Sequence, residues 1–155
     1  MRILLVRHAE AVNGGNGLDD AARYLSAHGR DTALRVANAL VAQGLHTTAT
    51  RFVASPRVRT QQTAEIFARA LGHTKPIETL TALCYTKPVK EAAAALRAMT
   101  GTVFAFGHMP TLPEIASLLA RGQAISSFSP SEALYIEDER AQWSLDPDNL
   151  VLTRI

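Results

Sequence analysis

The sequence predicts an α/β protein of three layers, in which a mostly parallel central sheet is flanked by helices. Short apolar segments of strand length alternate with longer segments of helical periodicity along most of the chain. The segments at 2–6, 51–54 and 102–106 are almost continuously apolar, which is typical of strands covered on both faces. The 155 residues suit a single domain over 1–155, because no repeat, low-complexity tract or linker divides them.

The first half of the chain is expected to contain two strands and two helices. Residues 2–6 form a short run with branched apolar side chains, followed by a loop rich in glycine and asparagine. Ser26 suits the N-cap of a helix that ends just before Gly44, a residue type that readily takes the left-handed conformation of a helix end. The second strand, at 51–54, leads through a Ser-Pro pair into a helix over about 58–71.

The second half of the chain is expected to add two helices and the rest of the sheet. One helix is an alanine-rich segment over about 89–99, and the other has Pro110 in its first turn, where proline is tolerated. The remaining extended segments are expected at 77–80, 102–106, 133–137, 142–145 and 150–153. The strand-rich end of the chain predicts an antiparallel edge on an otherwise parallel sheet.

The composition argues against several classes of protein. With 16 basic and 14 acidic residues, the formal charge of +2 gives no field that would favour nucleic acid. No apolar run approaches the 18 residues of a membrane span, and the N-terminal run is too short for a signal peptide, so we expect a cytoplasmic location by default. Cys84 is the only cysteine, so it cannot form an internal disulfide, and we expect it to be a packing residue. The oligomeric state is left open.

Cationic side chains and histidines follow three of the expected strands. Arg7 and His8 come directly after the first strand, Arg59 lies one turn beyond the second, and His108 follows the third. In open α/β sheets, ligands bind beyond the carboxyl ends of the strands, where helix N-termini also present unpaired N–H groups. These residues therefore predict an anion site of a size that suits phosphate. Arg57, in contrast, is expected to be a solvated helix residue.

The segments around these residues resemble the histidine phosphatase superfamily, which includes the phosphoglycerate mutases. Residues 5–10 (Leu-Val-Arg-His-Ala-Glu) are similar to its Arg-His signature, 55–64 to its second motif, and 106–108 to the segment of its second catalytic histidine. Residues 20–29 resemble a segment typical of short bacterial members. The matches keep the family order over residues 1 to about 120. The short chain resembles the SixA-type phosphohistidine phosphatases, which implies a phosphoglycerate mutase-like fold without a large cap insertion.

The resemblance implies a mechanism as well as a fold. His8 would attack phosphorus in line and become a covalent phosphohistidine, which water then hydrolyses. Arg7, Arg59 and His108 would bind the non-bridging oxygens and stabilise the charge of the transition state. No metal or cofactor is expected, because side chains supply the positive charge and no residues have convincing metal-ligand spacing. A backbone carbonyl or a carboxylate must hold the other nitrogen of His8, but the sequence does not identify it.

The sequence departs from the ester-cleaving members of the family at the general acid. Met109 stands directly after the second histidine, and Ala82 stands at the other place where a carboxylate would be expected. Glu78 is close in sequence and remains a possible acid. An alkoxide leaving group, with a conjugate acid of pKa ~15.7, needs protonation far more than an imidazole of pKa about 6.5. A missing acid therefore favours an N–P substrate over an O–P substrate.

The function predicted from the sequence is hydrolysis of phosphohistidine in a partner protein, or of a small phosphorylated compound. Asn13 and Arg23 are further candidates for binding phosphate and substrate. One alternative is a small-molecule phosphomonoester phosphatase of the same superfamily. A mutase is less expected, because a lid that would retain the phosphoryl group requires a longer chain. A second alternative is a phosphoprotein-binding module without turnover, but binding alone would not require His8.

Overall fold

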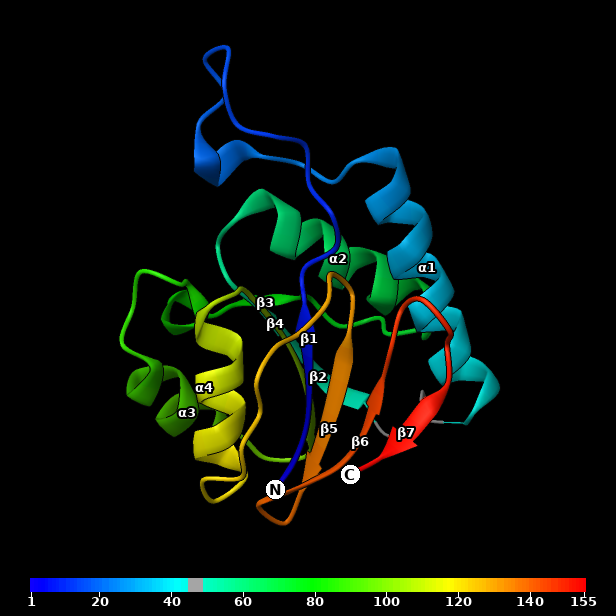
Figure 1. Cartoon of the computed structure of the whole chain (residues 1–155), viewed down its shortest axis with the longest axis vertical. Helices are drawn as coiled ribbons and strands as arrows, with labels where there is room; N and C mark the ends of the chain where they lie inside the picture. Colours follow the sequence, from blue (N-terminus) through cyan, green and yellow to red (C-terminus); the bar gives the residue numbers. More distant parts are fainter. Residues whose placement is uncertain (45–48) are drawn as a thin grey trace.

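The computed structural model describes residues 1–44 and 49–155, which build a seven-stranded sheet with helices on both faces (Figure 1). The strand order is β3-β2-β4-β1-β5-β6-β7. The strands are β1 (Arg2–Arg7), β2 (Ala49–Ala54), β3 (Glu78–Thr79), β4 (Thr102–Gly107), β5 (Ala133–Glu137), β6 (Arg140–Leu145) and β7 (Leu152–Arg154). The helices are α1 (Ala27–Ala42), α2 (Val58–Ala70), α3 (Val89–Arg97) and α4 (Thr111–Leu119), with short 3-10 helices η1 (Asp20–Ala22) and η3 (Thr81–Leu83).

The sheet is mixed, and its antiparallel part is larger than the predicted edge. Strands β3, β2, β4 and β1 pair in parallel, whereas each pairing from β1 through β5 and β6 to β7 is antiparallel. Between β5 and β6 the chain turns at Asp138 and Glu139, which both have positive φ, as in a two-residue hairpin turn. Such a short connection joins only antiparallel strands. The predicted α/β class is confirmed, and every predicted strand and helix is present.

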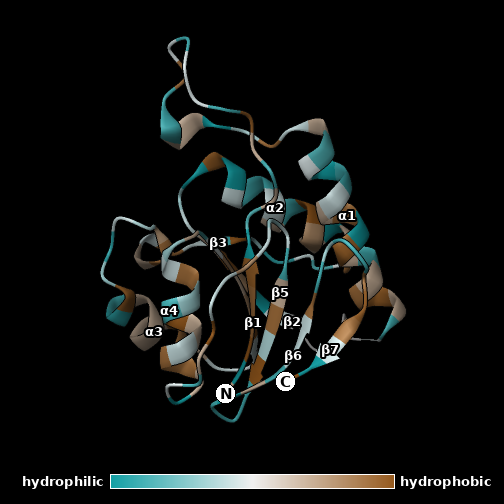
Figure 2. Cartoon of the chain, viewed as in Figure 1, coloured by the Kyte–Doolittle hydropathy of each residue, from teal (hydrophilic) through white to brown (hydrophobic). Residues whose placement is uncertain are grey.

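The helices divide between the two faces of the sheet. Helices α1 and α2 pack together on one face, and α3 and α4 pack together on the other. Along β1, Ile3 and Leu5 enter the core beneath α3 and α4, whereas Leu4 and Val6 enter the core beneath α1 and α2. This two-sided burial explains the continuously apolar strands, and β1 is coloured as hydrophobic along most of its length in the centre of the sheet (Figure 2).

The register of the parallel strands brings three chain segments to one edge. In β1 and β4, Arg7 pairs with Gly107, so the next residue of each strand, His8 and His108, leaves the sheet at the same level. Ser55 follows β2 beside them, and its N–H donates to the carbonyl of Phe106 over 3.2 Å. Helices α2 and α4 begin a few residues beyond these strand ends, as the sequence predicted.

The segment between β1 and α1 rises above this edge (Figure 1). It returns to the sheet because the N–H of Ser26 donates to the carbonyl of Glu10 over 3.0 Å. Ser26 also caps α1, since its Oγ accepts from the N–H of Gly29, as predicted. This segment between β1 and α1, called the excursion below, carries η1 back over the strand ends. Within the described ranges, no helix is long and apolar enough to cross a membrane.

Candidate active site

His8 lies at the end of β1 with its two ring nitrogens in different surroundings. Its Nδ1 lies 2.7 Å from the carbonyl oxygen of Ala9, so Nδ1 carries the proton and donates. The Nε of Arg59 points at Nε2 from 3.3 Å. The pKa of His8 is lowered to about 4, mainly by burial. The hydrogen bond to Ala9 raises this pKa, whereas the positive charges of Arg59, Arg7 and Arg23 lower it. His8 is therefore neutral at physiological pH, with a lone pair on Nε2.

Arg59 lies on the first turn of α2, and only 4% of its side chain is exposed. Its Nη1 donates to the backbone carbonyl of Asp20 over 2.7 Å, and its Nη2 lies 3.4 Å from the carboxylate of the same residue. This leaves Nε facing His8. The hydroxyl of Thr63 accepts from the N–H of Ala9 and donates to the carbonyl of Arg59, so it ties α2 to the end of β1.

His108 is almost fully buried at the end of β4. Its Nε2 lies 2.5 Å from Oγ of Ser55 and 3.3 Å from the hydroxyl of Thr60, and its ring centroid lies 5.1 Å from that of His8. Tyr85 packs its ring edge-on against His108. The pKa of His108 is lowered to about 3. Burial is the largest cause, and the positive charges of His8 and the nearby arginines lower it further. If Ser55 donates to Nε2, the neutral ring carries its proton on Nδ1.

Two buried side-chain nitrogens near His8 have no hydrogen-bond partner among residues 1–44 and 49–155. Nδ1 of His108 and Nε of Arg7 are buried without a hydrogen bond, although Nη1 of Arg7 donates to the carbonyl of Phe128 over 2.7 Å. Buried N–H groups in proteins normally have an acceptor. These two nitrogens belong to residues near His8: the His108 ring lies 5.1 Å from the His8 ring, and the charge of Arg7 lowers the pKa of His8 together with that of Arg59. The arrangement suits an oxyanion such as a phosphoryl group.

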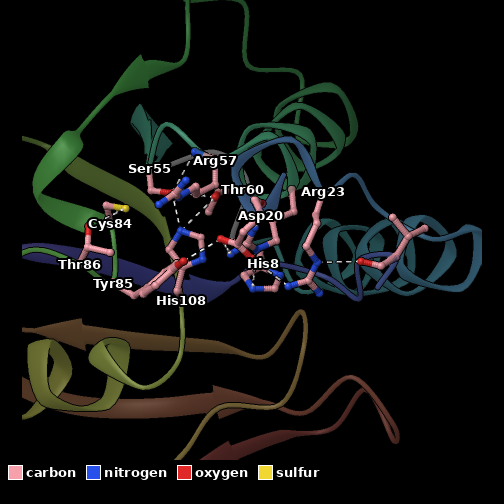
Figure 3. A network of polar contacts seen from close by, with 12 residues as sticks. His8, Asp20, Arg23, Ser55, Arg57, Thr60, Cys84, Tyr85, Thr86 and His108 are labelled. Carbon is pink, nitrogen blue, oxygen red and sulfur yellow. Dashed lines mark hydrogen bonds and ion pairs between the residues drawn. The ribbon is translucent and has the colours of Figure 1, made fainter. Parts of the chain in front are cut away.

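Asp20 and Tyr85 form the outer part of the site (Figure 3). The hydroxyl of Tyr85 donates to the Asp20 carboxylate over 2.7 Å, and Nη1 of Arg23 donates to its other oxygen over 3.1 Å. The pKa of Asp20 is lowered to about 2, mainly by the hydrogen bond from Tyr85. Arg23 and Arg59 lower it further, whereas desolvation raises it. Arg57 lies over the Tyr85 ring at 5.4 Å, with Nε buried. Arg57, expected as a solvated helix residue, is the N-cap of α2 and is half-buried, with its guanidinium against Tyr85.

The structure gathers some of the predicted residues and leaves others outside. Arg7, His8, Arg59 and His108 form one cluster, and Arg23 joins it through Asp20. Asn13 is exposed in the loop above the sheet edge. Glu78, the possible general acid, instead pairs with Arg51 over 2.6 and 2.8 Å, which lowers the pKa of Glu78 and keeps it ionised. Among residues 1–44 and 49–155, no three His, Cys, Asp or Glu side chains are grouped to ligate one metal ion.

Four site residues were not singled out from the sequence: Asp20, Ser55, Thr60 and Tyr85. Ser55, Thr60 and Asp20 lie inside the segments that carry the family resemblance, so position within a motif was a usable signal for them. Tyr85 had no such signal, because it follows a short 3-10 helix that has no periodic pattern. The unidentified group that holds the second nitrogen of His8 is the Ala9 carbonyl.

Comparison with known proteins places this geometry in context. A family model described as the histidine phosphatase superfamily (branch 1) matches residues 3–84. Phosphohistidine phosphatase SixA of Escherichia coli (strain K12) is 26% identical over 163 residues, which cover 99% of both chains. The structure of the protein histidine phosphatase SixA complexed with tungstate has a TM-score of 0.88 and 25% identity, and covers 97% of this chain and 100% of that one. A crystal structure described as the putative phosphohistidine phosphatase SixA from Agrobacterium tumefaciens has a TM-score of 0.79 and 24% identity, with 94% and 97% covered.

Proposed function

Because the chain belongs to the histidine phosphatase superfamily (branch 1), we propose that it is a phosphohistidine phosphatase that works through a covalent intermediate on His8. The observation that carries this proposal is the state of the His8 ring. The Ala9 carbonyl holds the Nδ1 proton at 2.7 Å, and the unprotonated Nε2 faces the arginine-rich cluster. A neutral, oriented imidazole beside an oxyanion site has the properties of an activated nucleophile.

In the first step, Nε2 of His8 attacks phosphorus as the bond from phosphorus to the leaving group breaks. The lone pair of Nε2 forms the new N–P bond, and the electron pair of the broken bond goes to the leaving group. The His8 ring becomes positively charged, and the Ala9 carbonyl stabilises that charge through Nδ1–H. The pKa of about 4 means that nearly every molecule holds His8 in its reactive form at neutral pH.

Two arginines and the neutral ring of His108 stabilise the charge on the phosphoryl oxygens. Arg7 offers its buried Nε, and His108 offers Nδ1. Nε of Arg59 donates to Nε2 of His8 over 3.3 Å in the free protein and passes to a phosphoryl oxygen when Nε2 attacks. These donors are held in place before substrate binds: Arg59 by Asp20 and His108 by Ser55. Fixed donors do not need to reorganise during the reaction, and a single contact of this kind typically contributes on the order of 100-fold to the rate. Water then attacks the phospho-His8 intermediate and releases phosphate.

The leaving group that fits this site best is an imidazole. The residue after His108 is Met109, whose side chain packs against the apolar core, and Glu78 is held as an anion by Arg51. Neither can protonate an alkoxide, which requires an acid far more than an imidazole does. The proposed substrate is therefore phosphohistidine, in a partner protein or in a small molecule. The named relative from Escherichia coli is likewise a phosphohistidine phosphatase.

Side-by-side rates on phosphohistidine, a phosphoserine peptide and a sugar phosphate test this proposal. We expect phosphohistidine to have the highest kcat/KM, and the His8→Ala variant to lose turnover on all three while it stays folded. Preference for an ester would replace the proposal with a phosphomonoester phosphatase. Binding of phosphorylated protein without hydrolysis of any substrate would replace it with a binding module.

A further inference from the structure

We propose that Asp20 is a specificity-determining residue, which accepts a hydrogen bond from the distal ring nitrogen of the substrate's phosphorylated imidazole. The inference rests on the proposed phosphohistidine phosphatase function and extends it to the leaving group. The catalytic cluster explains how phosphorus is attacked, but it does not explain how an imidazole is told apart from an alcohol or a phenol. A carboxylate at the rim of the cluster can make that distinction.

The argument begins with the symmetry of transfer between two imidazoles. When His8 attacks, its Nδ1–H must stay protonated and hydrogen-bonded, and Ala9 provides the acceptor over 2.7 Å. The departing imidazole has the same requirement at its own distal nitrogen, which should be protonated and hydrogen-bonded. If its distal nitrogen carries a proton, the P–N bond breaks, its electron pair remains on the proximal nitrogen, and neutral imidazole leaves. Without that proton an imidazolate would have to leave, which is a much poorer leaving group. An acceptor for the distal N–H therefore favours the step.

Asp20 has the position and the charge for this acceptor. It lies on η1, which the excursion after β1 carries back over the strand ends, and its carboxylate lies 3.4 Å from Nη2 of Arg59, whose Nε faces His8. Its negative charge also opposes the lowering of the His108 pKa, so it lies close enough to act on that ring. Figure 3 shows the Asp20 side chain beside the rings of His8 and His108.

The Asp20 carboxylate is held in place but not enclosed. Tyr85 and Arg23 donate to its two oxygens, while 40% of its side chain stays exposed to solvent. Each carboxylate oxygen has two lone pairs, so a further donor can be accepted. The ionisable groups that face it are Tyr85, Arg23, Arg59, Arg57 and His108. Most of them favour its ionised form, and an anion is what a protonated imidazole ring requires.

The test compares Asp20→Asn with wild type on two substrates, free phosphohistidine and an aryl phosphate whose leaving group has no N–H. Asparagine keeps the shape of the side chain and an oxygen that can accept from Tyr85, but it removes the charge. We expect kcat/KM for phosphohistidine to fall on the order of ten- to a hundredfold more than kcat/KM for the aryl phosphate, since the lost bond is to a charged group. Asp19→Asn is the matched control, because Asp19 is the exposed neighbour and its side chain makes no capping bond.

A second readout separates recognition of the ring from support of Arg59. In wild type, Asp20 should keep the distal nitrogen of the bound substrate protonated above its ordinary pKa of about 6.5. The alkaline limb of kcat for phosphohistidine, which reports groups in the enzyme–substrate complex, should therefore move to lower pH in Asp20→Asn. Equal losses on both substrates, with an unmoved limb, would overturn the proposal and leave Asp20 as a support for Arg59. A wild-type protein that hydrolyses no phosphohistidine would instead overturn the function on which the proposal rests, whatever the variant does.

Discussion

The ring of His8 lies 5.1 Å from the ring of His108, centroid to centroid, and the two planes are tilted by 59°. The in-register pairing of Arg7 with Gly107 in adjacent parallel strands produces this contact between two distant parts of the chain. Both rings are held neutral by burial, which lowers their pKa values to about 4 and about 3. The neutral state allows His8 to act as a nucleophile and His108 to act as a hydrogen-bond donor to an anion.

Nuclear magnetic resonance can test the neutral state directly. A titration of the ring nitrogens should give midpoints near pH 4 for His8 and near pH 3 for His108, well below the 6.5 of an unperturbed imidazole. Desolvation is the main cause, so replacement of a neighbouring arginine should raise the His8 midpoint only in part. Midpoints above pH 6 for both rings would show that the cluster does not exclude the charged forms.

The same pKa shifts predict how stability depends on pH. Between about pH 4 and pH 6.5, both histidines are neutral in the folded protein, whereas they take up protons in the unfolded chain. The unfolded state therefore binds more protons, and the free energy of unfolding should decrease as the pH falls through this window. Asp20, with a lowered pKa of about 2, loses its contribution only below its ordinary value of about 3.8 and so does not disturb the window.

Urea unfolding at several pH values measures this dependence. In the variant His108→Asn, the fall in stability between pH 6.5 and pH 4 should be shallower than in wild type, whatever its stability at neutral pH. An unchanged slope would mean that His108 titrates normally in the folded protein.

Arg59→Ala should reduce kcat on the order of 100-fold or more, because it removes a fixed guanidinium from the developing charge. Arg59→Lys should recover only part of the loss, since an ammonium lacks the planar fork by which Nη1 contacts Asp20 while Nε faces His8. Arg69→Ala is the control: Arg69 is an exposed residue at the other end of α2. A kcat within a few-fold of wild type for Arg59→Ala would place this side chain outside the reaction.

Ser55→Ala tests how His108 is oriented. Without the Ser55 hydroxyl 2.5 Å away, Nε2 of His108 keeps only the longer contact to Thr60, so the proton is no longer confined to Nδ1. We expect about a tenfold loss of kcat and a mixed tautomer in the ¹⁵N spectrum of His108, with about 1 kcal/mol of stability lost for the hydrogen bond. A variant with wild-type rate and an unchanged tautomer would contradict this role for Ser55.

Gly29→Ala should destabilise the fold at the place where the excursion rejoins α1. A Cβ at this position would lie 2.0 Å from the backbone carbonyl oxygen of Glu10. The overpacking costs about 1–3 kcal/mol, which exceeds the gain of up to about 1 kcal/mol from replacing glycine with alanine in a helix. Gly14→Ala is the control, because its new Cβ would meet no atom closer than 3.5 Å. Equal urea midpoints for both variants would show that α1 can move away from Glu10.

The clustering of Arg7, His8 and His108 could be predicted from the sequence because these residues lie at the ends of strands or directly after them. Once the runs before His8 and His108 are identified as buried parallel strands, their ends must lie at one edge of the sheet. Arg59 was predicted by the same argument, one helical turn beyond its strand. Strands β6 and β7 were expected as extended segments, but the extent of the antiparallel part of the sheet was not. It depends on a hairpin turn at Asp138 and Glu139, which lacks the glycine that usually marks such turns in a sequence.

The outer residues of the site could not be predicted in the same way. Tyr85 reaches Asp20 and His108 through a loop after η3, and no periodicity fixes where such a loop will lie. The position of Asp20 depends on a long excursion whose ends are tied by backbone hydrogen bonds, which have no side-chain signature. For the same reason, sequence proximity suggested Glu78 as an acid, whereas its carboxylate reaches Arg51 on the neighbouring strand.

The most direct test of the account is the chemical identity of the phosphorylated residue during turnover. Wild-type protein mixed with phosphohistidine, quenched in alkali within milliseconds and digested, should carry phosphate on Nε2 of His8, and the label should disappear on acid treatment and be absent from His8→Ala. Full turnover with no phosphate on His8 at any time would contradict the central claim, because phosphorus would then pass to water without the nucleophile that the Ala9 carbonyl holds in place.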